Sequence, residues 1–171
     1  LAAANGSLAE YLSFESALSA VDMALASSFA AVQAAMDLDN FIDFLAVEIY
    51  AVNTSWFHNR EMWKSNEAGG RWEWLLTDMD RGIALENLNN SLFDDFKRDP
   101  VYAQLIESEA FRQRFIQHYT AHLNSTLSPR RLASMVDSLA RGIAPEMVRH
   151  SARWSFQGGI ASPAAWEESL R

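Results

Sequence analysis

The chain of 171 residues contains no cysteine, which excludes a disulfide framework and a thiolate metal site. It also lacks a hydrophobic run of the roughly 18 residues that a membrane-spanning helix needs. The longest candidate, residues 24–36, is interrupted by Ser27, Ser28 and Gln33. The sequence therefore predicts no membrane span, whereas the absence of cysteine leaves the cellular compartment open.

Basic residues are scarce. Lysine and arginine number 14 against 22 acidic residues, and the net charge is −8 with neutral histidine. Nonspecific binding to nucleic acid needs a basic surface, so this balance argues against a nucleic-acid partner. A phosphorylated ligand would need a metal ion or a local basic patch to be tolerated.

The N-terminal residues lack the basic segment that opens a secretory signal peptide. The first residues, and the last residues with their helical pattern, suggest that this chain begins and ends inside a larger protein. Its length suits one domain with a real core, and 49% hydrophobic residues argue against disorder. We expect residues 1–171 to form a single domain, without repeats or low-complexity segments.

Helical patterns occupy most of the chain. We expect a short helix that begins at residues 7–11, alanine-rich helix over residues 17–36, and a central buried helix over residues 40–52. Asp37, Asp39 and Asn40 offer capping side chains ahead of that helix. Further helices are expected over residues 101–106, 109–124, 128–140 and 143–154, with a turn at Gly158 and Gly159 and a last helix opened by Ser162 and Pro163.

Residues 60–65 and 71–77 are the strongest strand candidates. The loop between them ends in Gly69 and Gly70, which can adopt positive φ. Trp72 and Trp74 share one face, and we expect Trp63 to pack across from one of them. The predicted fold class is mainly α with a small β-hairpin.

Asp78 and Asp80 follow the second strand directly. In an extended segment, residues two apart project to the same side, roughly 6–7 Å apart. Two carboxylates so placed repel unless water or a cation separates them, and Mg²⁺ accepts sparse oxygen ligands. Alone, this spacing also fits a solvated strand end.

Asn59 precedes the first strand. Because a hairpin brings its open ends together, we expect Asn59 and Asp78 to lie close. An amide oxygen with one or two carboxylates is a sensible partial shell for Mg²⁺, which phosphates and water would complete.

Several segments resemble the CotH family of spore-coat kinases and related secreted proteins. The resemblance rests on residues 39–44, 53–59 and 71–82, and on residues 111–115, 145–150 and Trp154 further along. It covers most of residues 8–171 in order. It implies the larger, helical C-lobe of an atypical protein-kinase-like fold, which transfers phosphate from ATP with Mg²⁺ or Mn²⁺ to coat or secreted proteins. It also implies an extracellular or cell-envelope location and a nucleotide lobe upstream of this chain.

Residue roles follow from the resemblance. Asp78 matches the metal-binding aspartate, and Asn59 lies where the second metal ligand falls, although another register would place Arg60 there. The family's catalytic base is an aspartate, but the matching position holds Ser55. A serine hydroxyl cannot accept a proton at neutral pH, and general-base help is typically worth about 10²–10⁴-fold. Phosphoryl transfer depends little on the base, so a Ser55 enzyme would be slow rather than inactive.

Three other residues could assist. His58 lies close enough in sequence to substitute as the base, and Lys64 and Arg81 could offset phosphate charge. Each also fits a structural role: a hydrogen-bonded corner histidine for His58, and solvated surface residues for the other two.

Other site classes fit less well. Asp37, Asp39 and Asp43 do not match a calcium-binding EF-hand loop, which needs a glycine and a distal glutamate. The six tryptophans are typical of core and hairpin packing rather than of a sugar-binding platform. Haloacid-dehalogenase phosphatases and metal-dependent glycosyltransferases also use Asp-x-Asp, but they need a doubly wound sheet that this sequence does not supply.

One alternative remains open. A kinase-like lobe could serve as a non-catalytic scaffold or binding module of the cell envelope or spore coat, with a structural partner in place of a protein substrate. Ser55 favours this alternative, whereas Asn59, Asp78 and Asp80 favour the enzyme.

Overall fold

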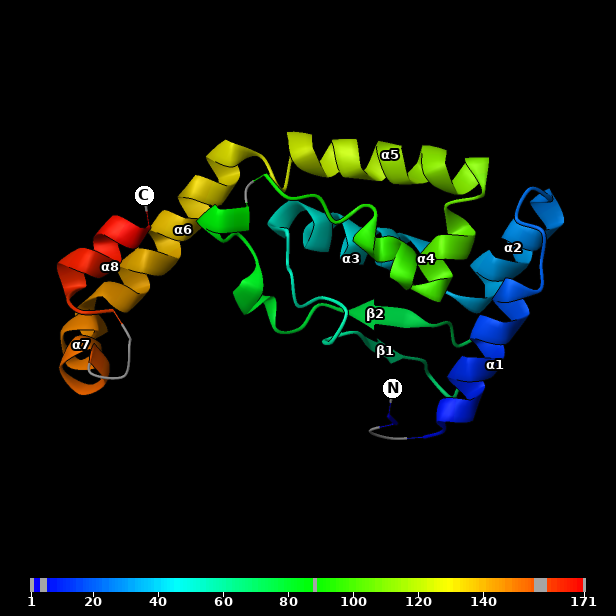
Figure 1. Cartoon of the computed structure of the whole chain (residues 1–171), viewed down its shortest axis with the longest axis horizontal. Coiled ribbons are helices and arrows are strands. Elements are labelled where there is room, and N and C mark those ends of the chain that lie inside the picture. The colour runs from blue at the N-terminus through cyan, green and yellow to red at the C-terminus, as the bar shows by residue number, and fades with distance from the viewer. Residues whose placement is uncertain (1, 4–5, 88, 156–159, 171) are drawn as a thin grey trace. The chain divides into compact units, whose positions relative to one another are not determined.

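The computed structural model describes residues 2–3, 6–87, 89–155 and 160–170. The described chain is mainly helical with one two-stranded antiparallel hairpin, which confirms the predicted fold class (Figure 1). Its elements divide into two compact units, residues 1–120 and 121–171. The predicted single domain stays a prediction. No helix in the described ranges is both long and apolar enough to cross a membrane.

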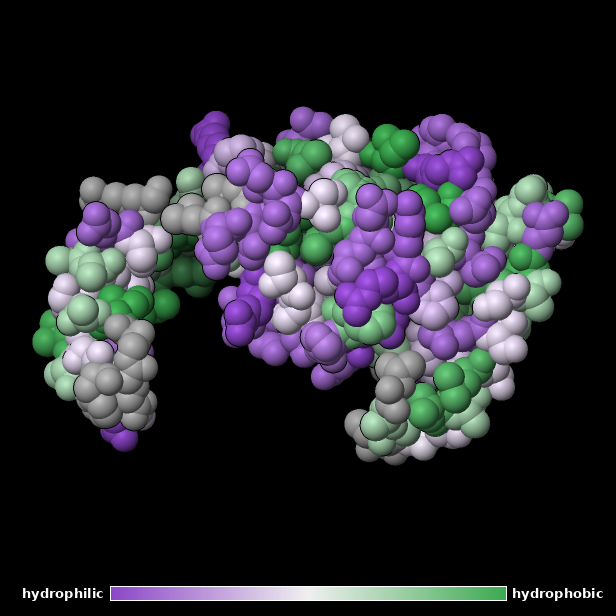
Figure 2. Space-filling model, viewed as in Figure 1, coloured by the Kyte–Doolittle hydropathy of each residue, from purple (hydrophilic) through white to green (hydrophobic). Residues whose placement is uncertain are grey.

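The first unit begins with two helices, α1 (Leu8–Ser19) and α2 (Ala26–Ala35). The Ser7 hydroxyl caps α1 by accepting from the Ala9 N–H at 3.2 Å, as expected. Continuous helix over residues 17–36 is wrong, because the Asp22 carboxylate accepts the Ala24 N–H at 2.9 Å and closes a local turn. Hydrophobic residues colour much of the visible surface over these two helices (Figure 2), where Leu12 and Leu25 are exposed.

Helix α3 (Leu38–Ala51) is the central element of this unit. Asp37 caps it by accepting the Asn40 N–H at 3.2 Å, and most of its residues are buried. Phe41 packs against Trp74 with ring centroids 4.5 Å apart. The helix ends at Val52, whose φ of 49° reverses the chain.

Strands β1 (Glu61–Trp63) and β2 (Glu73–Leu75) form the hairpin. The strands are shorter than predicted, and their register pairs Met62 with Trp74 and Trp63 with Glu73. The predicted packing of Trp63 against Trp72 or Trp74 is therefore wrong, because side chains alternate across the pleat and Trp63 projects to the opposite face. Trp63 is exposed, whereas Trp74 is buried.

The free edge of β2 is covered by the junction between α2 and α3. Trp72 donates to the Ala35 carbonyl at 3.0 Å and accepts from the Asp37 N–H at 2.8 Å. The Asn40 side chain then bonds to both backbone groups of Trp74, as the backbone of a neighbouring strand would. Its Oδ1 accepts the Trp74 N–H at 2.7 Å, and its Nδ2 donates to the Trp74 carbonyl at 3.1 Å. These bonds fix the hairpin against α3.

Three short 3₁₀ helices follow: η1 (Met79–Arg81), η2 (Leu85–Asn87) and η3 (Asp95–Arg98). Helix α4 (Pro100–Leu105) is capped by buried Asp99, which also pairs with Arg60. Helix α5 (Glu109–Asn124) has the predicted bounds and runs along α3 (Figure 1). Arg114 of α5 makes two hydrogen bonds, of 2.8 and 2.7 Å, to Asp39.

The second unit holds α6 (Pro129–Ile143), η4 (Ala144–Glu146), α7 (Met147–Trp154) and α8 (Pro163–Ser169). Ser162 caps α8 as expected, because its hydroxyl accepts the Ala165 N–H at 3.1 Å. The predicted turn at Gly158 and Gly159 lies outside the described residues.

Candidate functional site

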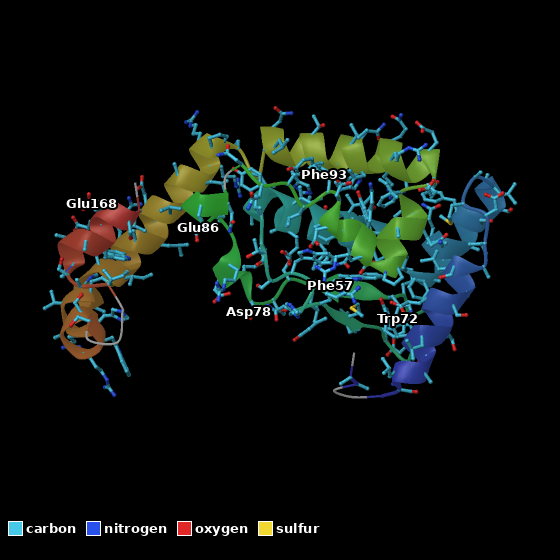
Figure 3. The ribbon with its side chains drawn as sticks, in the orientation of Figure 1. Phe57, Trp72, Asp78, Glu86, Phe93 and Glu168 are labelled. Carbon is cyan, nitrogen blue, oxygen red and sulfur yellow. The ribbon has the colours of Figure 1, made fainter. Side chains whose placement is uncertain are left out.

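The open end of the hairpin brings Asn59 and Asp78 together. Beyond the last ladder pair, the Thr77 hydroxyl donates to the Asn59 carbonyl at 2.9 Å. The Asn59 side-chain nitrogen donates to Asp78 Oδ2 at 3.0 Å. The expected proximity is therefore confirmed. Asp78 lies at one end of the hairpin and Trp72 at the other (Figure 3).

The chain leaves the extended conformation at Asp78, which has φ 52° and ψ 56°. Residues 79–81 then form η1, and Gly82 closes it by donating to the Met79 carbonyl at 3.0 Å. The expectation that Asp78 and Asp80 project from one extended segment is therefore wrong. Asp80 is exposed on this turn, and its part in a metal site stays a prediction.

Buried Asn53 organises the loop between α3 and β1. Its Oδ1 accepts the Ser55 N–H at 3.2 Å and the Ser55 hydroxyl at 3.0 Å. The Asn59 side-chain nitrogen donates to the Ser55 hydroxyl oxygen at 3.3 Å. Ser55 thus lies between Asn53 and the Asn59–Asp78 pair, which places the candidate base position beside the candidate metal ligands.

The segment after Asp78 is held against the end of α3. Ile83 donates to the Ala51 carbonyl. A β-carbon at Gly82 would lie 3.0 Å from the Ala51 β-carbon, so a larger residue there would force one of the two segments to shift. The Asn53 side-chain nitrogen also lies 3.5 Å from Met79 Sδ. The two loops that carry the candidate residues are therefore one packed cluster.

Backbone strain concentrates at this cluster. Among the described residues, Val52, Asp78 and Ile83 are the non-glycine residues with positive φ. Aspartate tolerates this conformation, but a β-branched valine or isoleucine rarely adopts it. Such strain persists where the surrounding structure imposes it, and it is common at functional sites.

The other predicted residues lie nearby without joining these hydrogen bonds. His58 is exposed, with its ring edge-on to Phe57, and its N–H donates to the Ser55 carbonyl at 3.0 Å. Arg81 is exposed on η1. Lys64 pairs with Glu10 and lies 5.4 Å from the centroid of the Trp72 ring.

Glu48 was not predicted as a site residue. Its side chain is buried in the last turns of α3, and burial raises its pKa to about 7 against the lowering effect of an Asn53 hydrogen bond. The sequence signal was a single glutamate inside the apolar pattern of residues 41–50.

A cavity of about 560 Å³ borders the hairpin and the start of α1. Arg60, Glu61 and Leu75 place it within a few residues of Asn59 and Asp78, and its lining also includes Lys64 and Trp72. Its volume falls within the usual range of small-molecule sites.

In metal-binding terms, Asn59 and Asp78 supply an amide and a carboxylate. The described residues contain no cluster of three or more histidine, cysteine, aspartate or glutamate side chains suited to a metal. A cation here would therefore depend on Asn59 and Asp78, with further ligands from substrate phosphates and water, the pattern that Mg²⁺ accepts.

Residues 4–171 match the sequence profile of a family described as CotH kinase protein. No curated protein and no solved structure matches the chain.

Proposed function

The chain belongs to the CotH kinase family, and we propose that it is the helical lobe of a kinase that transfers phosphate from ATP to a protein. We propose further that this lobe works with a nucleotide lobe encoded upstream in a longer protein. The observation that carries the proposal is the Asn59–Asp78 pair at the open end of the hairpin.

The pair fits a divalent cation. The Asn59 side-chain nitrogen donates to the Ser55 hydroxyl and to Asp78. The amide oxygen of Asn59 is therefore the atom that would coordinate a metal ion. Asp78 supplies a carboxylate, and Asp80 is a third candidate ligand. Bound Mg²⁺ or Mn²⁺ would neutralise charge on the phosphates of ATP.

The cavity beside the hairpin is a candidate site for the nucleoside part of ATP. Leu75 and Arg60 lie on its wall, and each is within three residues of a candidate metal ligand. We propose that ATP runs from this cavity toward Asp78, with Arg81 near the phosphates.

Ser55 stands at the base position. Its hydroxyl proton points to Asn53 Oδ1, so its lone pairs are left for Asn59 and for a substrate hydroxyl. We propose that Ser55 orients that hydroxyl without removing its proton, and that His58 is the alternative acceptor. Transfer would be slow because Ser55 lacks a carboxylate. It would still occur, because the loose transition state needs only modest help from a base.

Thermal unfolding of the longer protein tests the proposal. ATP together with Mg²⁺ or Mn²⁺ should raise the Tm of the parent protein, because a ligand that binds only the folded state stabilises that state. ATP without a divalent cation should not raise it. Asp78→Ala should abolish this rise. Asp94→Ala is the matched control, because Asp94 is an exposed aspartate paired with Lys97; it should keep the rise.

The second candidate is a non-catalytic kinase-like scaffold that binds a structural partner. Ser55 favours it, because this residue lacks the carboxylate of a general base. A parent protein whose Tm is unchanged by ATP with either metal would leave the scaffold as the better proposal.

A further inference from the structure

The loop between Ser55 and Asn59 is bonded to η3, which lies further along the chain. Trp56 directly follows Ser55 and is only 1% exposed. The Trp56 Nε1–H donates to Asp95 Oδ2 at 2.6 Å, and the Trp56 ring stacks on Phe96 with ring centroids 3.9 Å apart. An indole N–H can only donate, so a buried tryptophan needs an acceptor, and Asp95 supplies a charged one.

Asp95 also reaches the next residue of the loop. Its Oδ1 accepts from Arg98 Nη1 at 3.0 Å, and Arg98 Cζ lies 4.2 Å from the centroid of the Phe57 ring. A second guanidinium, that of Arg60, lies 4.5 Å from the same centroid and pairs with buried Asp99. Because a guanidinium is attracted to an aromatic ring, fixing Arg98 also fixes the position of Phe57.

The residues that Asp95 holds stand between the candidate base position and a candidate metal ligand. The loop consists of two overlapping turns: the His58 N–H donates to the Ser55 carbonyl at 3.0 Å, and the Asn59 N–H donates to the Trp56 carbonyl at 3.3 Å. A displacement of Trp56 would therefore move the carbonyl to which Asn59 is bonded. It would also change the 3.3 Å contact between the Asn59 and Ser55 side chains.

Bonds at the two ends of the loop leave its middle to Asp95. Asn53 bonds to the start of the loop, at Ser55, and Asp78 bonds to its end, at Asn59. The Asp95 carboxylate supplies the bond to the side chain in between.

The neighbouring aspartate shows that a surface ion pair alone does not explain Asp95. Asp94 pairs with Lys97 across one turn, and its side chain is 92% exposed. Asp95 forms the same kind of pair with Arg98, but its second oxygen accepts from the loop of the candidate site.

We infer that Asp95 is a positioning residue, which fixes the loop between Ser55 and Asn59 for the reaction. The kinetic part of this inference rests on the proposed function, whereas the structural part does not. Asp95 itself does not touch a reacting atom in this proposal; it acts through Trp56.

Nuclear magnetic resonance of the 171-residue chain tests the structural part. Asp95→Ala should shift the Trp56 indole N–H signal. It should also shift the Ser55 backbone amide and the Asn59 side-chain amide, although in the described structure neither residue hydrogen-bonds to Asp95. Asp95→Asn keeps an oxygen that can accept from Trp56, so the Ser55 and Asn59 signals should stay close to those of the parent.

Asp94→Ala is the matched control, because it removes the neighbouring carboxylate and an ion pair of the same spacing. It should leave the Trp56, Ser55 and Asn59 signals in place. The inference is overturned if the Ser55 and Asn59 signals stay unchanged in folded Asp95→Ala, or if Asp94→Ala moves them equally.

One measurement needs no variant and therefore remains if Asp95→Ala does not fold. In the parent, the Trp56 indole hydrogen should exchange with solvent at least about tenfold more slowly than that of Trp63, which is 45% exposed. Equal exchange rates would show that Asp95 does not hold Trp56, and the inference would fail.

Kinetics of the longer protein with Mg²⁺ and ATP test the second part. Asp95→Ala should lower kcat by about 10- to 100-fold, as expected for misplaced reacting groups, and leave the KM for ATP within about twofold. Asp95→Asn should recover most of kcat, and Asp94→Ala should match the parent.

Three kinetic results would count against the inference. An unchanged kcat in Asp95→Ala, or a rise in the KM for ATP as large as the fall in kcat, would contradict positioning of the loop. So would an Asp95→Asn variant no faster than Asp95→Ala. A parent without phosphate transfer whose Ser55 and Asn59 signals respond as expected would refute the proposed function and leave the structural part standing.

Discussion

The carboxylate of Glu48 makes the stability of the chain depend on pH. Its pKa is about 7 when folded, above the ordinary value of 4.5. Between these values the folded chain holds a proton that the unfolded chain has lost, so the contribution of Glu48 to stability is full below pH 4.5 and falls as pH rises to 7. The loss amounts to about 3 kcal/mol.

We therefore expect Glu48→Gln to be more stable than the parent at pH 8 and closer to it at pH 5. Urea unfolding followed by circular dichroism measures both free energies. A difference between variant and parent that stays constant from pH 5 to pH 8 would show that Glu48 is not buried as described.

Ser55 gives a second prediction at this scale. If the missing carboxylate limits transfer, Ser55→Asp in the longer protein should raise phosphate incorporation by at least about tenfold, since general-base help is worth 10²–10⁴-fold. Ser55→Asn is the matched control, because it is similar in size to aspartate but cannot accept a proton. Unchanged or lower incorporation with Ser55→Asp would argue that the base position lies elsewhere.

Single residues also show what the sequence could predict. Asn59 and Asp78 were found because a hairpin must bring its open ends together. Asp80 was misplaced because the left-handed conformation of Asp78 has no clear sequence signal. The sequence predicts only that a helix ends at residue 52, ahead of Asn53, because the orientation of a buried amide depends on groups that only the folded chain assembles.

At the level of elements, the attachment of β2 to the start of α3 decides where the hairpin lies. Asn40 satisfies both the N–H and the carbonyl of buried Trp74. Asn40→Ala should lower the free energy of unfolding by about 2–4 kcal/mol, because it leaves two buried backbone groups without partners. Urea unfolding measures this loss.

Asn66→Ala is the control for this prediction, because Asn66 is exposed in the hairpin loop. It should change the free energy of unfolding by less than about 0.5 kcal/mol. Equal effects of the two variants would mean that Asn40 does not anchor the hairpin.

Helices were predicted well where periodicity was regular, and α5 has the expected bounds. The break between α1 and α2 was missed because one Asp22 side chain, rather than a glycine or proline, interrupts an alanine-rich pattern. The cover over the edge of β2 could not be predicted, because it joins backbone groups near residue 36 to residue 72, far away in the sequence.

At the scale of the whole molecule, charge is distributed unevenly. Residues 1–120 contain 18 acidic and 8 basic side chains, whereas residues 121–171 contain 4 and 6. The unit that carries the candidate site is therefore strongly negative, and it would repel the phosphates of ATP unless a divalent cation accompanied them.

For the 171-residue chain alone we expect weak or absent ATP binding, even with Mg²⁺, because the proposed nucleotide lobe is not part of it. Isothermal titration calorimetry measures the affinity. A Kd below about 1 μM, which corresponds to more than 8 kcal/mol of binding free energy, would contradict the proposed division of labour between two lobes.

The bonds from Asn53 through Ser55 and Asn59 to Asp78 run from a fully buried side chain to the surface. The candidate loop consequently cannot open by itself, because any opening must pull Asn53 out of the interior. Amide hydrogens around Ser55 should then exchange with solvent only as slowly as those of α3. Because this loop is already ordered, a ligand that binds to it would not incur the conformational-entropy cost of ordering it.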